Sequence, residues 1–100
     1  MVDVKQPFFG ASQNLQTNDF QSPQDMAVAC TMFPTGVSWH MCVVKGGAYQ
    51  YINKAGITQF RLRFQLFDDD DLSADLVNFW SGNAVTANYR PILMVQYYVP

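Results

Sequence analysis

The stretch that decides the fold runs from Thr58 to Gly82 and reads TQFRLRFQLFDDDDLSADLVNFWSG. Its first part alternates strictly, with apolar side chains at Phe60, Leu62, Phe64 and Leu66. Side chains of an extended chain point alternately to opposite faces, so Thr58–Phe67 is predicted to be a strand with one core face and one face that is solvated or paired. The aspartate run cannot continue this strand, because four adjacent carboxylates repel one another. A second strand is predicted beyond it, at Leu76–Trp80.

The rest of the chain repeats this design of short strands and turns. Four more segments have the apolar character of strands, and turns rich in Gly, Pro and Asn separate them: Val2–Lys5, Met26–Phe33, Ser38–Val44 and Ile92–Val99. Gly10–Gln24 is a polar connection, and Ala48–Ile52 fits either a helical turn or a short strand. The sequence therefore predicts one all-β domain over residues 1–100, a β-sandwich. Its core is expected to hold Trp39, Trp80, Tyr97 and Tyr98.

Composition limits the possible functions. Only 14% of the residues are charged, well below the usual quarter, which indicates a surface that contacts another copy or another domain. Six Lys and Arg residues within a net charge of -2 do not form the basic face that nucleic-acid binding needs. There is no apolar run long enough for a membrane-spanning helix. The start of the chain does not look like a signal peptide, and the sequence leaves the compartment open.

The two cysteines are predicted to lie close together. If Pro34–Ser38 is the loop of a hairpin, Phe33 faces Trp39 and the same register places Cys30 opposite Cys42. Such a cross-strand pair is within reach of a disulfide. Two interpretations remain: a structural disulfide of an exported protein, or two reduced cysteines that fill the core as small apolar residues.

The aspartates suggest a cation site. Hard oxygen ligands of the kind that Ca²⁺ prefers cluster at one strand end, at Asp68, Asp69, Asp70, Asp71 and Asp75. The spacing is not that of an EF-hand, and the alternative is a solvated turn whose carboxylates pair with arginines. Asp75, beside apolar neighbours, is a candidate buried partner for an arginine. Arg61 and Arg63 are predicted to bind carboxylates or backbone carbonyls and to serve the structure.

No pattern indicates catalysis. His40 is the only histidine, and no zinc, hydrolase or thiol-redox motif accompanies it. A pair formed with Cys42, on the same predicted strand face, is the one enzyme hypothesis, and we expect no enzyme. Aromatic side chains near turns could instead stack on the C–H faces of sugars, and the candidates are Tyr49, Tyr51 and Tyr89.

Four segments together resemble a known family: NDFQSPQDMAVA from Asn18, AYQYINKAGITQFRLRF from Ala48, DDDDLSADLVNFWSGNA from Asp68 and NYRPILMVQYYVP from Asn88. They are similar to the C-terminal part of DNRLRE-type jelly-roll domains, which are related to carbohydrate-binding modules and occur in large bacterial secreted and surface proteins. Modules of this family have further strands upstream of the position that matches Met1. The resemblance therefore implies completion by a second copy or a partner chain, or a reduced sandwich.

The resemblance implies a non-catalytic jelly-roll module that binds carbohydrate or a cell surface. The different alternative is a structural module with no small ligand, which buries its apolar surface against another copy. A homo-oligomer is expected under both interpretations, and neither involves nucleic acid or membrane insertion. No cofactor is expected apart from the candidate calcium ion.

Overall fold

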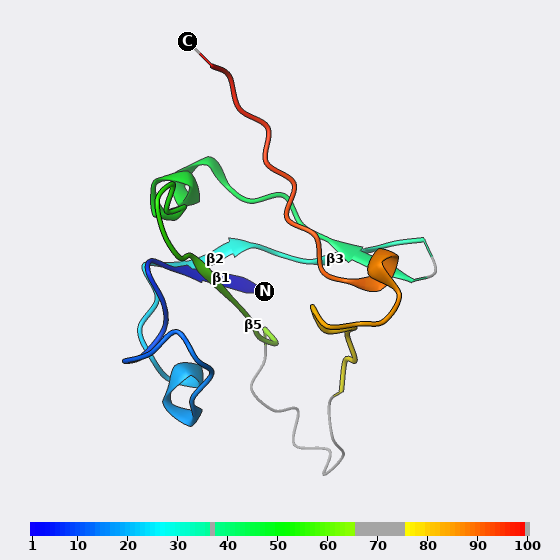
Figure 1. Cartoon of the computed structure of the whole chain (residues 1–100), viewed down its shortest axis with the longest axis horizontal. Coiled ribbons are helices and arrows are strands. Elements are labelled where there is room, and N and C mark those ends of the chain that lie inside the picture. Colours follow the sequence, from blue (N-terminus) through cyan, green and yellow to red (C-terminus); the bar gives the residue numbers. More distant parts are fainter. Residues whose placement is uncertain (37, 66–75, 100) are drawn as a thin grey trace. The chain divides into compact units, whose positions relative to one another are not determined.

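A computed structural model describes residues 1–36, 38–65 and 76–99, and it divides the chain into two compact units, Met1–Phe67 and Asp68–Pro100 (Figure 1). The described residues form two small antiparallel sheets, with 3₁₀-helices between the strands. The fold is therefore β-rich, with almost no helix. The elements are β1 (Val2–Lys5), η1 (Thr17–Phe20), β2 (Met26–Cys30), β3 (Phe33–Thr35), β4 (Trp39–Met41), η2 (Gly46–Tyr51), β5 (Gln59–Leu62) and η3 (Ala87–Tyr89).

The larger sheet has the order β2-β1-β5, with the first strand of the chain at its centre. The prediction of a strand at Val2–Lys5 is confirmed. β1 runs antiparallel to both neighbours, and Val4 lies opposite Phe60 of β5 and Met26 of β2. The core cluster consists of Val4 with Ala29 and Ala48, against which four larger side chains pack: Met26, Val44, Tyr51 and Phe60.

β5 is shorter than predicted, and its predicted core face is buried only in part. Phe60 packs against the core cluster, but Leu62 and Phe64 are 47% and 52% exposed. The Arg61 side chain, on the opposite face, is paired and only 13% exposed. Arginine is buried here because a buried carboxylate, Asp3, lies opposite it on β1.

The smaller sheet is the β3–β4 hairpin, and its register differs from the prediction by two residues. Phe33 lies opposite Met41, and Thr35 opposite Trp39. The prediction assigned Pro34 to the loop, whereas the structure keeps it in β3 and turns more tightly, through Gly36 in the left-handed region at φ 66°. Such a φ favours glycine, which has no Cβ. Trp39, predicted for the core, is 45% exposed.

The ambiguous Ala48–Ile52 segment takes the helical alternative. It lies largely within the 3₁₀-helix η2, which buries Ala48. The polar connection 10–24 contains η1 and ends before β2. None of the helices in the described part of the chain has the length and apolar character needed to cross a membrane.

The described residues 76–99 of the second unit contain η3 and no strand, so the strands predicted at Leu76–Trp80 and Ile92–Val99 are not formed. Strands need a hydrogen-bonded neighbour, and no described ladder includes either segment. The predicted core positions are wrong for the same reason. Trp80 is 63% exposed, Tyr97 74% and Tyr98 92%.

Candidate functional site

A buried ion cluster organises the first unit. Asp3 is fully buried in β1. Arg61 Nη2 and Arg63 Nε donate to its Oδ2 at 2.9 and 2.8 Å, and the backbone N–H of Val28 donates to Oδ1 at 2.9 Å. Burial alone would raise the pKa of Asp3. The hydrogen bonds from Arg63, Val28 and Arg61 outweigh it and lower the pKa to about 2.

Arg61 also ties the polar connection to the sheet. Its Nη1 donates to the backbone carbonyls of Asp19, Phe20 and Ser22 at 2.8, 3.2 and 2.8 Å. Its guanidinium lies 4.5 Å from the centre of the buried Phe9 ring, a cation–π contact. The predicted structural role of Arg61 is confirmed, because it joins the polar connection to β1 and β5.

The buried partner of the arginines is Asp3, which the sequence interpretation missed. The candidate named for that role, Asp75, lies outside the described residues. One sequence feature pointed to Asp3: it stands between Val2 and Val4 in a predicted strand. An acid that is buried in such a position needs a cationic partner.

The structure joins Cys30 and Cys42 in a disulfide, with their Cα atoms 5.7 Å apart. The backbone N–H of Lys45 donates to the carbonyl of Ala29 at 2.9 Å near the disulfide. The two cysteines lie next to each other, although the β3–β4 register is not the one from which this proximity was predicted. In the disulfide, Cys42 has no thiol to act as a nucleophile beside His40, which lies on β4 opposite Pro34.

The proposed calcium ligands Asp68, Asp69, Asp70, Asp71 and Asp75 all lie outside the described residues. Within the described ranges, no group of three or more His, Cys, Asp or Glu side chains is placed to hold a metal ion. The calcium site therefore stays a prediction from the sequence.

The second unit presents a stacked aromatic pair. The rings of Trp80 and Tyr89 have their centroids 5.3 Å apart and an interplanar angle of 24°. Trp80 is 63% exposed and Tyr89 50%, and we call this pair the aromatic platform. An open hollow of about 330 Å³ adjoins it, lined by Asn78, Phe79 and Trp80. That volume is at the lower end of the range for small-ligand sites.

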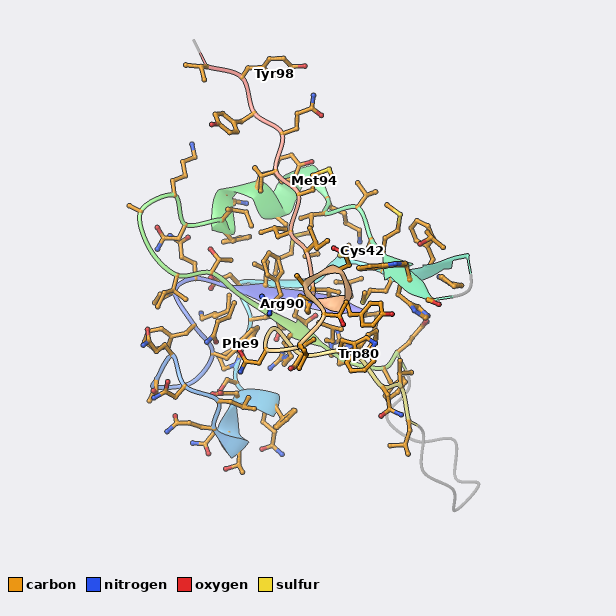
Figure 2. All side chains as sticks on the ribbon, turned by 45° about the vertical axis from the view of Figure 1, so that its right-hand side comes forward. Phe9, Cys42, Trp80, Arg90, Met94 and Tyr98 are labelled. Atoms are coloured by element: carbon orange, nitrogen blue, oxygen red, sulfur yellow. A yellow bond between two sulfur atoms is a disulfide. The ribbon has the colours of Figure 1, made fainter. Side chains whose placement is uncertain are left out.

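Local hydrogen bonds hold the platform in shape. The N–H of Ala84 donates to the carbonyl of Ser81 at 3.1 Å and forms a turn directly after Trp80. η3 carries Tyr89, whose N–H donates to Thr86 at 3.0 Å. Arg90 Nε then reaches back to the carbonyl of Ala84 at 2.8 Å, and Figure 2 labels Trp80 and Arg90. This side chain ties the segment after Tyr89 to the turn after Trp80.

The three tyrosines proposed for ligand contact have different surroundings. Tyr89 belongs to the platform, and Tyr49 is 61% exposed on η2 of the first unit. Tyr51 packs against the core cluster and offers less of its ring to a ligand. Trp80 was assigned to the core and is instead the most exposed ring of the stacked pair. The Ser-Gly turn that directly follows it was the available signal for a surface position.

Comparisons with known proteins found no match. No protein-family model, no curated protein and no solved structure matches this chain.

Proposed function

We propose that the chain is a non-catalytic β-module that binds carbohydrate on its aromatic platform. The observation that carries this proposal is the stacking of Trp80 and Tyr89 with both rings at least half exposed. A monomeric protein gains nothing from exposing two large rings side by side unless something covers them. The C–H faces of a sugar ring are apolar and flat enough to do so, and Asn78 beside the hollow supplies an amide for its hydroxyl groups.

The platform is also held before a ligand arrives. The turn at Ser81, η3 and the Arg90 hydrogen bond restrain the backbone on both sides of the rings. Restraint of this kind lowers the entropy cost of binding. It distinguishes Trp80 and Tyr89 from exposed aromatic residues on unrestrained chain.

The test is a glycan array probed with the purified chain, followed by titration of the best oligosaccharide by isothermal titration calorimetry, a signal that does not depend on either tryptophan. Trp80→Ala should weaken binding at least about fivefold, because stacking of one ring is worth about 1 kcal/mol or more. Trp39→Ala is the matched control: it removes an exposed tryptophan from the other unit and should leave affinity unchanged. The proposal would be overturned if no glycan on the array bound the chain, or if the two variants changed the affinity equally.

We also propose the finer architecture, a jelly-roll sandwich of the DNRLRE type. The alternation within β1 and β5 and the antiparallel pairing of all described strands support it. An experimental structure would test it directly, since a sandwich requires two sheets packed face to face.

Self-association is a second candidate, and a separate observation favours it. All seven apolar side chains of Ile92–Val99 are between 59% and 92% exposed. That is far more contiguous apolar surface than single scattered residues provide. Sedimentation velocity over a concentration series tests this candidate: a chain that stays monomeric at about 100 µM, which corresponds to a standard free energy near −5.5 kcal/mol, would rule it out.

A further inference from the structure

β5 offers a regular, open backbone edge. Met1 N donates to Arg63 O at 2.7 Å, and Arg63 N donates to Met1 O at 2.9 Å. Reciprocal pairs alternate along an antiparallel ladder, so Arg61, two residues before, also directs its backbone groups toward β1. The N–H and C=O groups of Phe60 and Leu62 therefore point away from β1, to the side where no described strand pairs with β5.

The opposite edge of the sheet is less suited to a new strand. β2 has a register shift against β1, and Val28 within it has a positive φ of 54°. Its Ala29 carbonyl already accepts a hydrogen bond from Lys45. An added strand would meet an irregular, partly occupied edge at β2 and a regular one at β5.

The same chain carries a segment with every property of a strand except a neighbour. Ile92–Val99 reads ILMVQYYV, with no charge, glycine or proline, and most of its residues are β-branched or aromatic. Eight extended residues span about 26 Å, more than the length of β5. Figures 1 and 2 show this segment as extended coil, and Figure 2 labels Met94 and Tyr98 along it.

We propose that Ile92–Val99 of one copy adds as a strand along the open edge of β5 of a second copy. This inference rests on the proposed self-association and gives its mechanism. Each chain has one donor segment and one acceptor edge, so two copies can satisfy each other. The face formed by Leu93, Val95, Tyr97 and Val99 is wholly apolar. It extends the side of β5 that carries Phe60 and the exposed Leu62.

Area and charge favour a second copy as the occupant. Each copy contributes two tyrosines, which can bury about 150–250 Å² each, and five aliphatic side chains. A reciprocal exchange buries this set of side chains twice. The total buried area then exceeds the roughly 1,200 Å² at which specific interfaces begin. Arg61 of β5 and Arg63 directly after it donate to Asp3 within their own copy, so the uncharged donor brings no unpaired charge into the contact.

The experiment removes backbone donors from each side separately and follows sedimentation. Leu62→Pro deletes an N–H that points away from β1, so it should block the acceptor edge while far-UV circular dichroism stays that of the parent. Val95→Pro with Gln96→Pro blocks the donor in either register. Each variant should associate at least tenfold more weakly than the parent. The matched controls, Leu62→Thr and the threonine pair at 95 and 96, keep every N–H and should associate more than their proline counterparts.

Mixing supplies the decisive result. The acceptor-blocked chain keeps its donor and the donor-blocked chain keeps its edge, so an equimolar mixture should regain a complex that neither variant forms alone. A parent that is monomeric throughout overturns both self-association and this mechanism. A parent that associates, with proline variants that associate equally well, keeps self-association and overturns strand addition.

Discussion

The two units of this chain use their side chains in opposite ways. In Met1–Phe67 the group that costs most to bury, the carboxylate of Asp3, is fully buried and paired with Arg61 and Arg63. In Asp68–Pro100 the groups that gain most from burial, Trp80 and the apolar Ile92–Val99, are exposed. The carboxylate of Asp3 finds its partners within the first unit. Both proposals for function involve exposed residues of the second unit.

The largest loss of stability is expected when the buried carboxylate of Asp3 is removed. Asp3→Ala leaves two arginines without their carboxylate and should cost about 3–5 kcal/mol of unfolding free energy. Asp25→Ala is the control, because its partly exposed pair with Lys5 should be worth about 1 kcal/mol. Urea denaturation measures both, and an Asp3→Ala chain that is already unfolded beside a folded control agrees with the expectation. Equal losses would show that burial of the cluster does not matter.

The disulfide comes next. Cys30 and Cys42 are separated by 12 positions, and closing a loop of that size stabilises by about 3 kcal/mol in the chain-entropy account. Reduction with dithiothreitol should lower the free energy of unfolding by this amount. The double variant Cys30→Ala, Cys42→Ala should show the loss already and should not respond to the reductant. A parent protein that is indifferent to reduction would contradict the prediction.

The free energy of unfolding is also expected to depend on pH through Asp3. The pKa of Asp3 is lowered from 3.8 to about 2 in the folded chain. Its stabilisation is therefore complete above about pH 4 and is lost as the pH falls through 2, by roughly 2 kcal/mol. Asp3→Asn should remove this part of the pH dependence. The pKa of Asp25 is also lowered, by hydrogen bonds from Lys5 and Gln6, so Asp25→Asn separates the two contributions in the same unfolding series.

Calcium tests the acidic run at the start of the second unit. If Asp68, Asp69, Asp70, Asp71 and Asp75 bind Ca²⁺, a concentration ten times Kd should stabilise the chain by about 1.4 kcal/mol. Thermal melts with Ca²⁺ and with EDTA measure the effect as a rise of several degrees in Tm. Replacing the four consecutive aspartates by asparagine should abolish the rise. An identical Tm in 10 mM Ca²⁺ and in EDTA would exclude the site.

The smallest effect on stability is expected at the platform. Trp80→Ala removes an exposed ring and one stacking contact, so it should cost below about 1 kcal/mol. A tryptophan in a core would cost about 3–5 kcal/mol. Urea denaturation of this variant thus tests whether Trp80 belongs to a surface, independently of any sugar. A loss of several kcal/mol would assign it to a core after all.

The outcome of the sequence predictions follows the range of the interactions involved. β1 was predicted in full, because Val2 and Val4 face the same way and turn residues follow. The ends of β5 and the strands at Leu76–Trp80 and Ile92–Val99 were overpredicted. An apolar alternating segment is suited to be a strand, but only a hydrogen-bonded neighbour makes it one. The hairpin register was wrong by two residues, because the loop could not be located from Pro34 alone.

The candidate site shows the same limit. Tyr89 was named as a contact residue from its place near a turn, whereas Trp80 was assigned to the core because tryptophans usually are. Its stacking partner stands nine positions further along the chain, and sequence spacing does not reveal such a contact.

By itself the sequence determined that the chain is rich in β-structure, has only six Lys and Arg residues and carries arginines that need acceptors. These follow from composition and alternation, which are local properties. Only the tertiary structure decided which acid the arginines hold, which face of β5 is buried and which rings stack. Each of these depends on residues that meet across tens of positions. There the balance between desolvation and pairing is set by neighbours that no local pattern contains.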